Sequence, residues 1–196
     1  MFDELFNNLK NNLKEFVTSK VEEAGKELEK RFGVPEAIEP FTLIRRFTTA
    51  DSTVTQGGIA INGETWQIEA YNDGYNQQLV NISEPLRSVI LFEVVEPDVQ
   101  ECVLACRFYA RALNTEKSIR VCLGFARKGQ WGTTTTYRAS SLTQSGDFQL
   151  YETRAHYKKE TDSCKIQITV QFESSGILLI RDIELLQAAV KPQPSN

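Results

Sequence analysis

The sequence predicts a mostly β protein: an antiparallel β-sandwich preceded by one long N-terminal amphipathic α-helix. Two observations lead to this prediction. Beyond residue 41, short runs of residues alternate between apolar and polar, a period typical of half-buried strands. Clusters of turn residues separate these runs, and no helical pattern lies between them, which favours antiparallel pairing over βαβ units. Before residue 33 the apolar period is instead that of a helix.

The predicted helix covers residues 2–32, which carry apolar side chains every three or four positions. These are Phe2, Phe6, Leu9, Leu13, Val17, Val21, Ala24, Leu28 and Phe32. Gly33 and Pro35 follow, as is common beyond a helix end. We therefore assign the domain boundaries in chain order: 1–33 amphipathic helix, 34–41 hinge, 42–188 sandwich and 189–196 disordered tail.

The apolar stripe of this helix has three interpretations. First, it could pack on its own sandwich. Second, residues 2–32 could form a coiled coil, either with copies of this chain or with a protein partner. Third, it could lie in a membrane interface. Its polar face has nearly balanced charge rather than an excess of lysine, which weakens the membrane interpretation without removing it. We favour helix-mediated oligomerisation, which would array several sandwich domains.

The clearest strand signal is residues 58–70, where two alternating runs meet at Asn62-Gly63, the preferred pair for a tight hairpin turn. The other runs predicted as strands are 42–48, 86–95, 101–112, 118–126, 133–138, 147–157, 164–173 and 177–186. Many short strands at such spacing are typical of sandwiches.

Composition narrows the function classes. The net charge of −4 gives no argument for a nucleic-acid partner. No apolar run reaches the roughly 20 residues that span a bilayer, and the N-terminus lacks a signal-peptide core, so we expect a cytoplasmic protein. The four cysteines form no CxxC or Cys/His pattern, and Cys102 and Cys106 lie too far apart along one strand to pair, which indicates free thiols.

The strand order resembles that of jelly-roll carbohydrate-binding modules of the galactose-binding-domain-like type, over roughly residues 41–188. The resemblance rests on "ECVLACRFYARA" followed by "KSIRVCLGF", on "SGDFQLYETRAHY", on "ETWQIEA", and on the closing pair "KIQITVQFESSGILLIRDIELLQ". It implies a jelly-roll fold, a frequent role in saccharide binding and, in some members, a structural calcium ion.

Strand parity locates candidate ligand-binding residues. In residues 102–112, Cys106, Phe108 and Ala110 point to one face, taken as the core, while the intervening side chains point to the other. If this strand shares a sheet with residues 118–126 and 164–173, the outer face of that sheet collects Arg107, Tyr109, Arg111, Arg120, Lys165, Gln167 and Gln171.

Such a surface suits two kinds of ligand. An aromatic ring and planar donors fit a saccharide, and several cations favour an anionic small molecule. Polar side chains on a sheet face can equally be solvated. Trp131 in a basic loop is a further candidate, with packing under its loop as the alternative, and Tyr71 and Tyr75 could line a loop-end site.

Catalysis has little support. His156 is the single histidine, and no hydrolase or metalloprotease motif accompanies it, so we predict no enzyme. The preferred function is a non-catalytic binding or assembly protein in which a helical oligomer presents jelly-roll domains that bind a carbohydrate or anionic ligand. The alternatives are a scaffold component that binds another protein through its sandwich, and a peripheral membrane protein anchored by the helix.

Overall fold

The computed structural model describes residues 33–70, 87–95, 98–129, 132–159 and 165–192. The chain divides into two compact units, Met1–Val34 and Pro35–Asn196. The predicted helix lies outside the described residues, so it stays a prediction. In the part of the chain that is described, no helix is long and apolar enough to cross a membrane.

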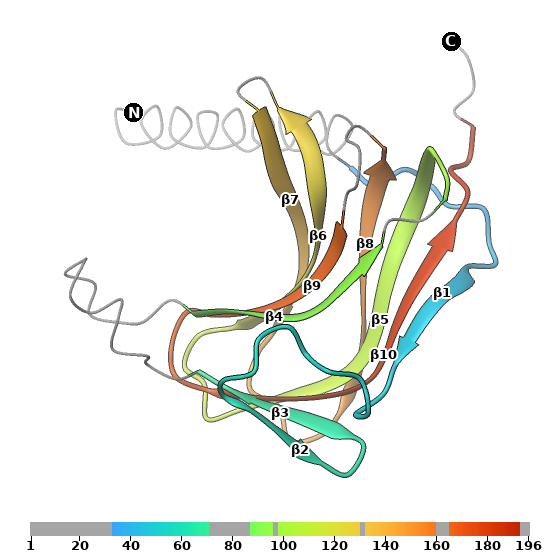
Figure 1. Cartoon of the computed structure of the whole chain (residues 1–196). Coiled ribbons are helices and arrows are strands. Elements are labelled where there is room, and N and C mark those ends of the chain that lie inside the picture. Colours follow the sequence, from blue (N-terminus) through green and yellow to red (C-terminus); the bar gives the residue numbers. More distant parts are fainter. Residues whose placement is uncertain (1–32, 71–86, 96–97, 130–131, 160–164, 193–196) are drawn as a thin grey trace, which may run out of the picture. The chain divides into compact units, whose positions relative to one another are not determined.

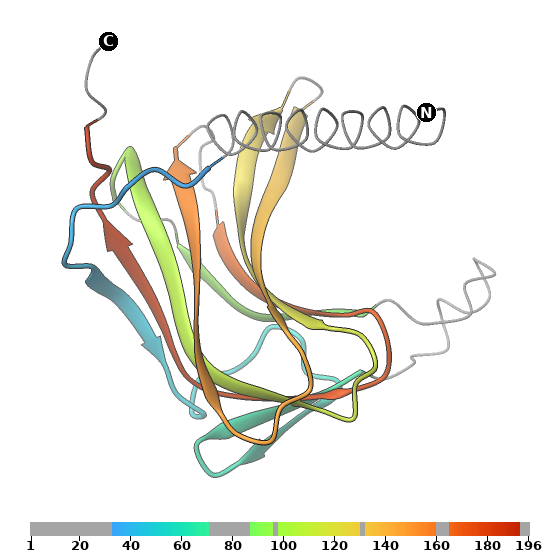
Figure 2. The same cartoon turned by 180° about the vertical axis from the view of Figure 1, so that it is seen from behind.

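One sheet of the second unit has six strands in the described residues. They are β1 (Thr42–Phe47), β2 (Ile59–Asn62), β3 (Thr65–Glu69), β5 (Glu101–Leu113), β8 (Gln149–Lys158) and β10 (Ile177–Ala188). Their order is β2-β3-β10-β5-β8. The strand β1 pairs with the later part of β10, along the same edge on which β3 pairs with its first part. Seen from behind, β8, β5, β10 and β1 run side by side (Figure 2).

The other sheet has four described strands, β4 (Arg87–Val95), β6 (Ile119–Gly129), β7 (Gly132–Leu142) and β9 (Lys165–Phe172). Their order is β4-β9-β6-β7, and all pairings in both sheets are antiparallel. The chain passes from one sheet to the other between β3 and β4, β4 and β5, and β5 and β6 (Figure 1). The antiparallel sandwich predicted from the alternating runs is confirmed.

The core lies between the two sheets, as the alternation predicts. Cys106, Phe108 and Ala110 of β5 are at most 1% exposed, and Trp66 of the hairpin is buried as well. Phe92 of β4 stacks on Phe47 of β1, with ring centroids 4.1 Å apart, which joins the four-stranded sheet to the six-stranded one. Burial of apolar side chains of both sheets against each other is the main stabilising contribution in such a fold.

Three of the four cysteines lie in the described part, and all three are buried and free. Burial raises the pKa of Cys102 to about 11 and that of Cys106 to about 12. Both thiols are therefore protonated at neutral pH and pack as small apolar groups. The prediction of free thiols is confirmed for Cys102, Cys106 and Cys122, and Cys164 lies outside the described residues.

A β-bulge in β10 shapes the outer face of the six-stranded sheet. Arg181 pairs with Tyr109, whereas Glu184 pairs with Arg107, so two residues of β10 stand opposite one residue of β5. Within the bulge, Asp182 has φ 51°, a left-handed conformation that is uncommon outside glycine. Residues three apart face opposite sides of a regular strand, but the extra residue here turns both Arg181 and Glu184 outward.

The segments assigned to the hinge and the tail meet each other in the fold. The Ile38 amide donates to the Ala189 carbonyl at 2.9 Å, and the Lys191 amide donates to the Glu36 carbonyl at 2.8 Å. Ala37 forms a bridge with Val190. These parts of the two segments are thus held against each other, while residues 193–196 lie outside the described range.

Candidate functional site

The structure separates the predicted site residues into two groups. Arg107, Tyr109 and Arg111 lie on β5 of the six-stranded sheet. The others lie on β6 and β9 of the four-stranded sheet: Arg120, Lys165, Gln167 and Gln171. The prediction that these strands share a sheet is wrong, because the chain crosses to the opposite sheet between β5 and β6. Trp131, Tyr71 and Tyr75 lie outside the described residues.

On the four-stranded sheet, the predicted cations bond to acidic neighbours. Arg120 Nη2 lies 2.9 Å from Glu173 Oε1, and Lys165 Nζ lies 2.7 Å from Glu93 Oε2. Gln167 also donates to Glu93, at 2.8 Å. The hydrogen bond from Lys165 is the largest of the causes that hold the pKa of Glu93 below its ordinary value.

The centre of this outer face contains small residues. Thr169 is 1% exposed, and its hydroxyl has no hydrogen-bond partner. Cys122 stands beside it in register on β6 and is 2% exposed. Among the side chains described on β4, β6 and β9, none that faces outward is aromatic.

One half of the outer face of the six-stranded sheet carries alternating charges, which we call the charge row. Its members are Arg46 on β1, Glu184 on β10, Arg107 on β5, Glu152 and Arg154 on β8, and Glu39 in the segment before β1. Arg46 Nε donates to Glu184 at 2.9 Å, and Arg107 Nε donates to Glu152 at 2.9 Å. Arg107 therefore has a carboxylate partner of its own.

Glu152 is the centre of this row. Arg107 donates two hydrogen bonds to its Oε2 atom, and Arg154 bonds its Oε1 atom. Burial alone would raise the pKa of Glu152, but the hydrogen bonds from Arg154 and Arg107 outweigh it and hold the pKa below its ordinary value. The carboxylate is thus ionised at neutral pH and links two strands.

The other half of this face holds a second set of side chains, which we call the guanidinium–aromatic cluster: Tyr109, Arg111, Phe148 and Arg181. The Arg181 guanidinium carbon lies 4.7 Å from the centre of the Phe148 ring and 6.0 Å from that of Tyr109. The Arg111 guanidinium carbon lies 5.3 Å from the same Phe148 ring. These are cation–π distances, so each aromatic ring helps to fix an arginine.

Next to the cluster lies an exposed apolar platform. Tyr109 is 40% exposed, and Leu150, which stands directly opposite it on β8, is 54% exposed. A ring and an aliphatic side chain of this kind can cover the apolar face of a pyranose, while guanidinium groups beside them donate to hydroxyl or carboxylate oxygens. The cluster can therefore bind, but it offers no nucleophile or acid–base pair.

Sequence reasoning identified Tyr109 and Arg111 but missed Phe148 and Arg181. Phe148 precedes β8, and only the pairing of β8 with β5 brings it near Arg111. Alternation with the buried Leu178 and Ile180 gives Arg181 the outer parity, but only the pairing of β10 with β5 places it beside Tyr109. The adjacent Asp182, in a strand otherwise rich in apolar residues, was the available signal for the bulge, which returns Ile183 and Leu185 to the core.

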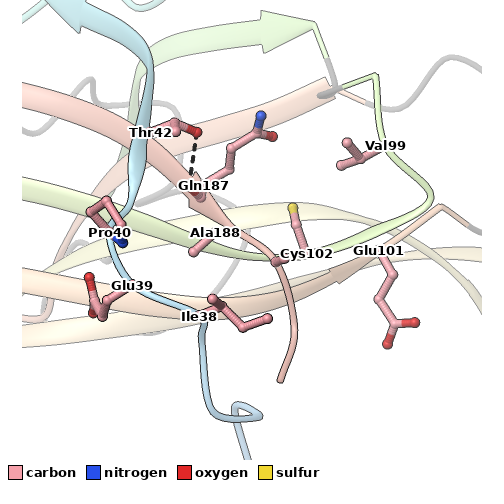
Figure 3. A pocket seen from close by; sticks show the side chains of 10 residues that line it. Ile38, Glu39, Pro40, Thr42, Val99, Glu101, Cys102, Gln187 and Ala188 are labelled. Carbon is pink, nitrogen blue, oxygen red and sulfur yellow. Dashed lines mark hydrogen bonds between the residues drawn. The ribbon is translucent and has the colours of Figure 1, made fainter. Parts of the chain in front are cut away.

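A pocket of about 390 Å³ lies apart from the cluster, where the chain before β1 meets the ends of β5 and β10. Its lining includes Ile38, Pro40, Thr42, Val99, Cys102 and Gln187. Glu39 and Glu101 also line it, and the close view shows them together with Cys102, Gln187 and Val99 (Figure 3). The lining thus combines apolar side chains with a hydroxyl, an amide and two carboxylates.

Within the described ranges, no group of three or more histidine, cysteine, aspartate or glutamate side chains is placed to hold a metal ion. His156, the single histidine, lies with Nε2 2.6 Å from Glu101 Oε1, as an exposed cross-strand contact.

No protein-family model and no curated protein sequence matches the chain. Among solved structures, the chain is similar to the CBM22-1 xylan-binding domain of Xyn10C from Paenibacillus barcinonensis, at 13% identity and a TM-score of 0.46, over 79% of this chain and 100% of that one. It is similar to a family 16 carbohydrate-binding module at 10% identity and a TM-score of 0.42, over 64% of this chain and 79% of that one.

A third similar structure is TmCBM61 in complex with beta-1,4-galactotriose, at 19% identity and a TM-score of 0.36, over 76% of this chain and 89% of that one. The structures similar to this chain therefore include carbohydrate-binding modules of several classes, the group that its strand order resembles. All three TM-scores lie below 0.5.

Proposed function

We propose that this protein is a non-catalytic binding protein whose jelly-roll sandwich holds a carbohydrate on the outer face of its six-stranded sheet. One observation carries the proposal: Tyr109 and Leu150 form an exposed apolar pair on β5 and β8, with Arg111 and Arg181 beside them. Saccharides are recognised by this combination of an apolar platform and adjacent hydrogen-bond donors.

Replacing Tyr109 by alanine tests this proposal. We expect the affinity for a bound oligosaccharide to fall about tenfold or more, because the variant loses its stacking surface. The melting temperature should change little, since the Tyr109 side chain is 40% exposed. A glycan array identifies the oligosaccharide, and isothermal titration calorimetry then measures its affinity for both proteins.

Leu43→Ala is the matched control, because Leu43 is an apolar residue of the same sheet with 53% exposure and lies on β1. Its affinity should equal that of the unchanged protein. An array that retains no glycan, or a Tyr109→Ala variant that binds as well as the unchanged protein, would reject the proposal. A protein partner captured through this surface without any bound glycan would support the scaffold alternative.

We also propose that residues 2–32 assemble the chain into oligomers, on the basis of their apolar spacing. Light scattering on the full chain should give a multiple of 22.2 kDa. A variant with Leu9→Lys and Leu13→Lys would interrupt the apolar stripe of the helix, and its mass in solution should then fall to that of one chain. A full-length protein that is monomeric at micromolar concentration would contradict the proposed oligomerisation. Flotation of the full chain with liposomes would support the membrane alternative.

A further inference from the structure

The two halves of the outer face of the six-stranded sheet differ in how their arginines are neutralised. In the charge row, Arg46 and Arg107 each donate to a carboxylate at 2.9 Å. In the guanidinium–aromatic cluster, no carboxylate of the described residues lies within 4 Å of Arg111, and Arg181 has only the exposed Asp182, 3.6 Å from its Nε atom. The cluster thus presents guanidinium groups that an added anion can still neutralise.

The two arginines of the cluster are held in place before any ligand binds. Arg111 donates through Nη1 to the Gly146 carbonyl at 3.0 Å and stacks on Phe148. Arg181 stacks on the same ring and reaches the Tyr109 ring. The Nε atoms of both arginines are buried, so each side chain has already lost part of its rotamer freedom. Binding therefore costs less conformational entropy than at two mobile arginines.

The bulge in β10 lies directly after Arg181, which faces outward by alternation with the buried Leu178 and Ile180. Without an extra residue, Arg181 and Glu184 would lie on opposite faces of the strand. Asp182 adopts φ 51° at this point, a conformation that costs free energy for a residue other than glycine. Bulges commonly redirect a side chain next to a functional site. Here Arg181 brings a second guanidinium to Tyr109 and Phe148, and the bulge keeps Glu184 on the same outer face.

We infer that the carbohydrate bound on this face is acidic, and that Arg111 and Arg181 bind the carboxylate of a uronic acid residue. This inference rests on the proposed function. Guanidinium groups match the two oxygens of a carboxylate in a planar, bidentate arrangement. Because the Arg181 guanidinium lies 6.0 Å from the Tyr109 ring centre, one sugar residue can stack on Tyr109 while its carboxylate reaches the arginine.

The test compares acidic oligosaccharides with their neutral esters. Trimers of galacturonate, glucuronate and mannuronate, and the methyl esters of each, are titrated into the full chain by calorimetry. At least one acid should bind about tenfold or more tightly than its ester, and raising the salt concentration should weaken the acid alone. Arg111→Gln and Arg181→Gln should each lower the affinity for the acid about tenfold, and that for the ester by clearly less, because the ester loses a neutral hydrogen bond and not an ion pair.

Arg46→Gln is the control, because it removes a guanidinium from the same outer face but from the charge row, where Glu184 neutralises it. Its affinity for the acid should be unchanged. If acid and ester bind equally and both depend on Tyr109, the inference fails and the proposed function stands. If no oligosaccharide binds, the proposed function fails. If inorganic phosphate binds through both arginines with no dependence on Tyr109, the site is a general anion site and the uronic acid is rejected.

Discussion

Replacing Phe92 by alanine is expected to lower the free energy of unfolding by about 3–5 kcal/mol. Phe92 lies on β4 of the four-stranded sheet and is 3% exposed. Its ring stacks on Phe47 and meets the edge of Trp66 at 5.5 Å. Because Phe47 and Trp66 belong to the six-stranded sheet, the alanine would remove an aromatic contact that joins the two layers. Urea denaturation followed by tryptophan fluorescence measures the loss.

Two further variants make this result specific. Ile61→Ala removes an apolar side chain that is 55% exposed, and its cost should stay within about 0.5 kcal/mol. Phe92→Leu keeps most of the apolar volume and should cost clearly less than the alanine. If Phe92→Ala costs no more than Ile61→Ala, the aromatic contact between the sheets does not contribute as the structure indicates.

The alternation of side chains was a reliable guide to strands and to their buried faces. On β5, Cys106 and Phe108 are buried and Tyr109 is exposed, as the parity predicts. The prediction works because successive side chains of a strand point to opposite faces, and the core accepts only one of them. At the start of β5, Val103 and Ala105 are buried as well, although they have the outer parity.

The partners of each strand could not be predicted in the same way. β5 ends at Leu113 and β6 begins at Ile119, a separation that also suits a hairpin. Consecutive strands usually pair, yet here the chain crosses to the opposite sheet. Either arrangement buries the same inward residues, so alternation does not distinguish them. Parity and strand order alone therefore place Arg120 on the face of Arg107, although the two lie on different sheets.

The guanidinium–aromatic cluster shows a second limit of sequence reasoning. Tyr109 and Arg111 lie on one strand, so their parity relates them directly. Arg181 joins them only through the pairing of β10 with β5, and the bulge after it places Glu184 on the same face. One extra residue reverses parity along the rest of a strand. A site built from several strands is thus predictable within each strand, but not across them.

Replacing Glu152 by glutamine is expected to lower the free energy of unfolding at neutral pH by about 1–2 kcal/mol. Glu152 accepts hydrogen bonds from Arg107 and Arg154, and its side chain is 24% exposed. The neutral amide cannot balance both guanidinium groups, which would then repel each other. A double-mutant cycle of Glu152→Gln with Arg107→Gln should show a positive coupling energy that decreases in 1 M salt.

The same contribution should depend on pH in a defined direction. Because the pKa of Glu152 is lowered in the folded protein, the carboxylate contributes its full stability above the unfolded pKa of about 4.3. That contribution should be lost as the pH falls through the lower folded pKa, so the difference between the unchanged protein and Glu152→Gln should shrink there. Urea denaturation between pH 7 and pH 2.5 measures it. A difference that stays constant over this range would show that the charge of Glu152 does not stabilise the fold, and that the charge row is only a solvated surface.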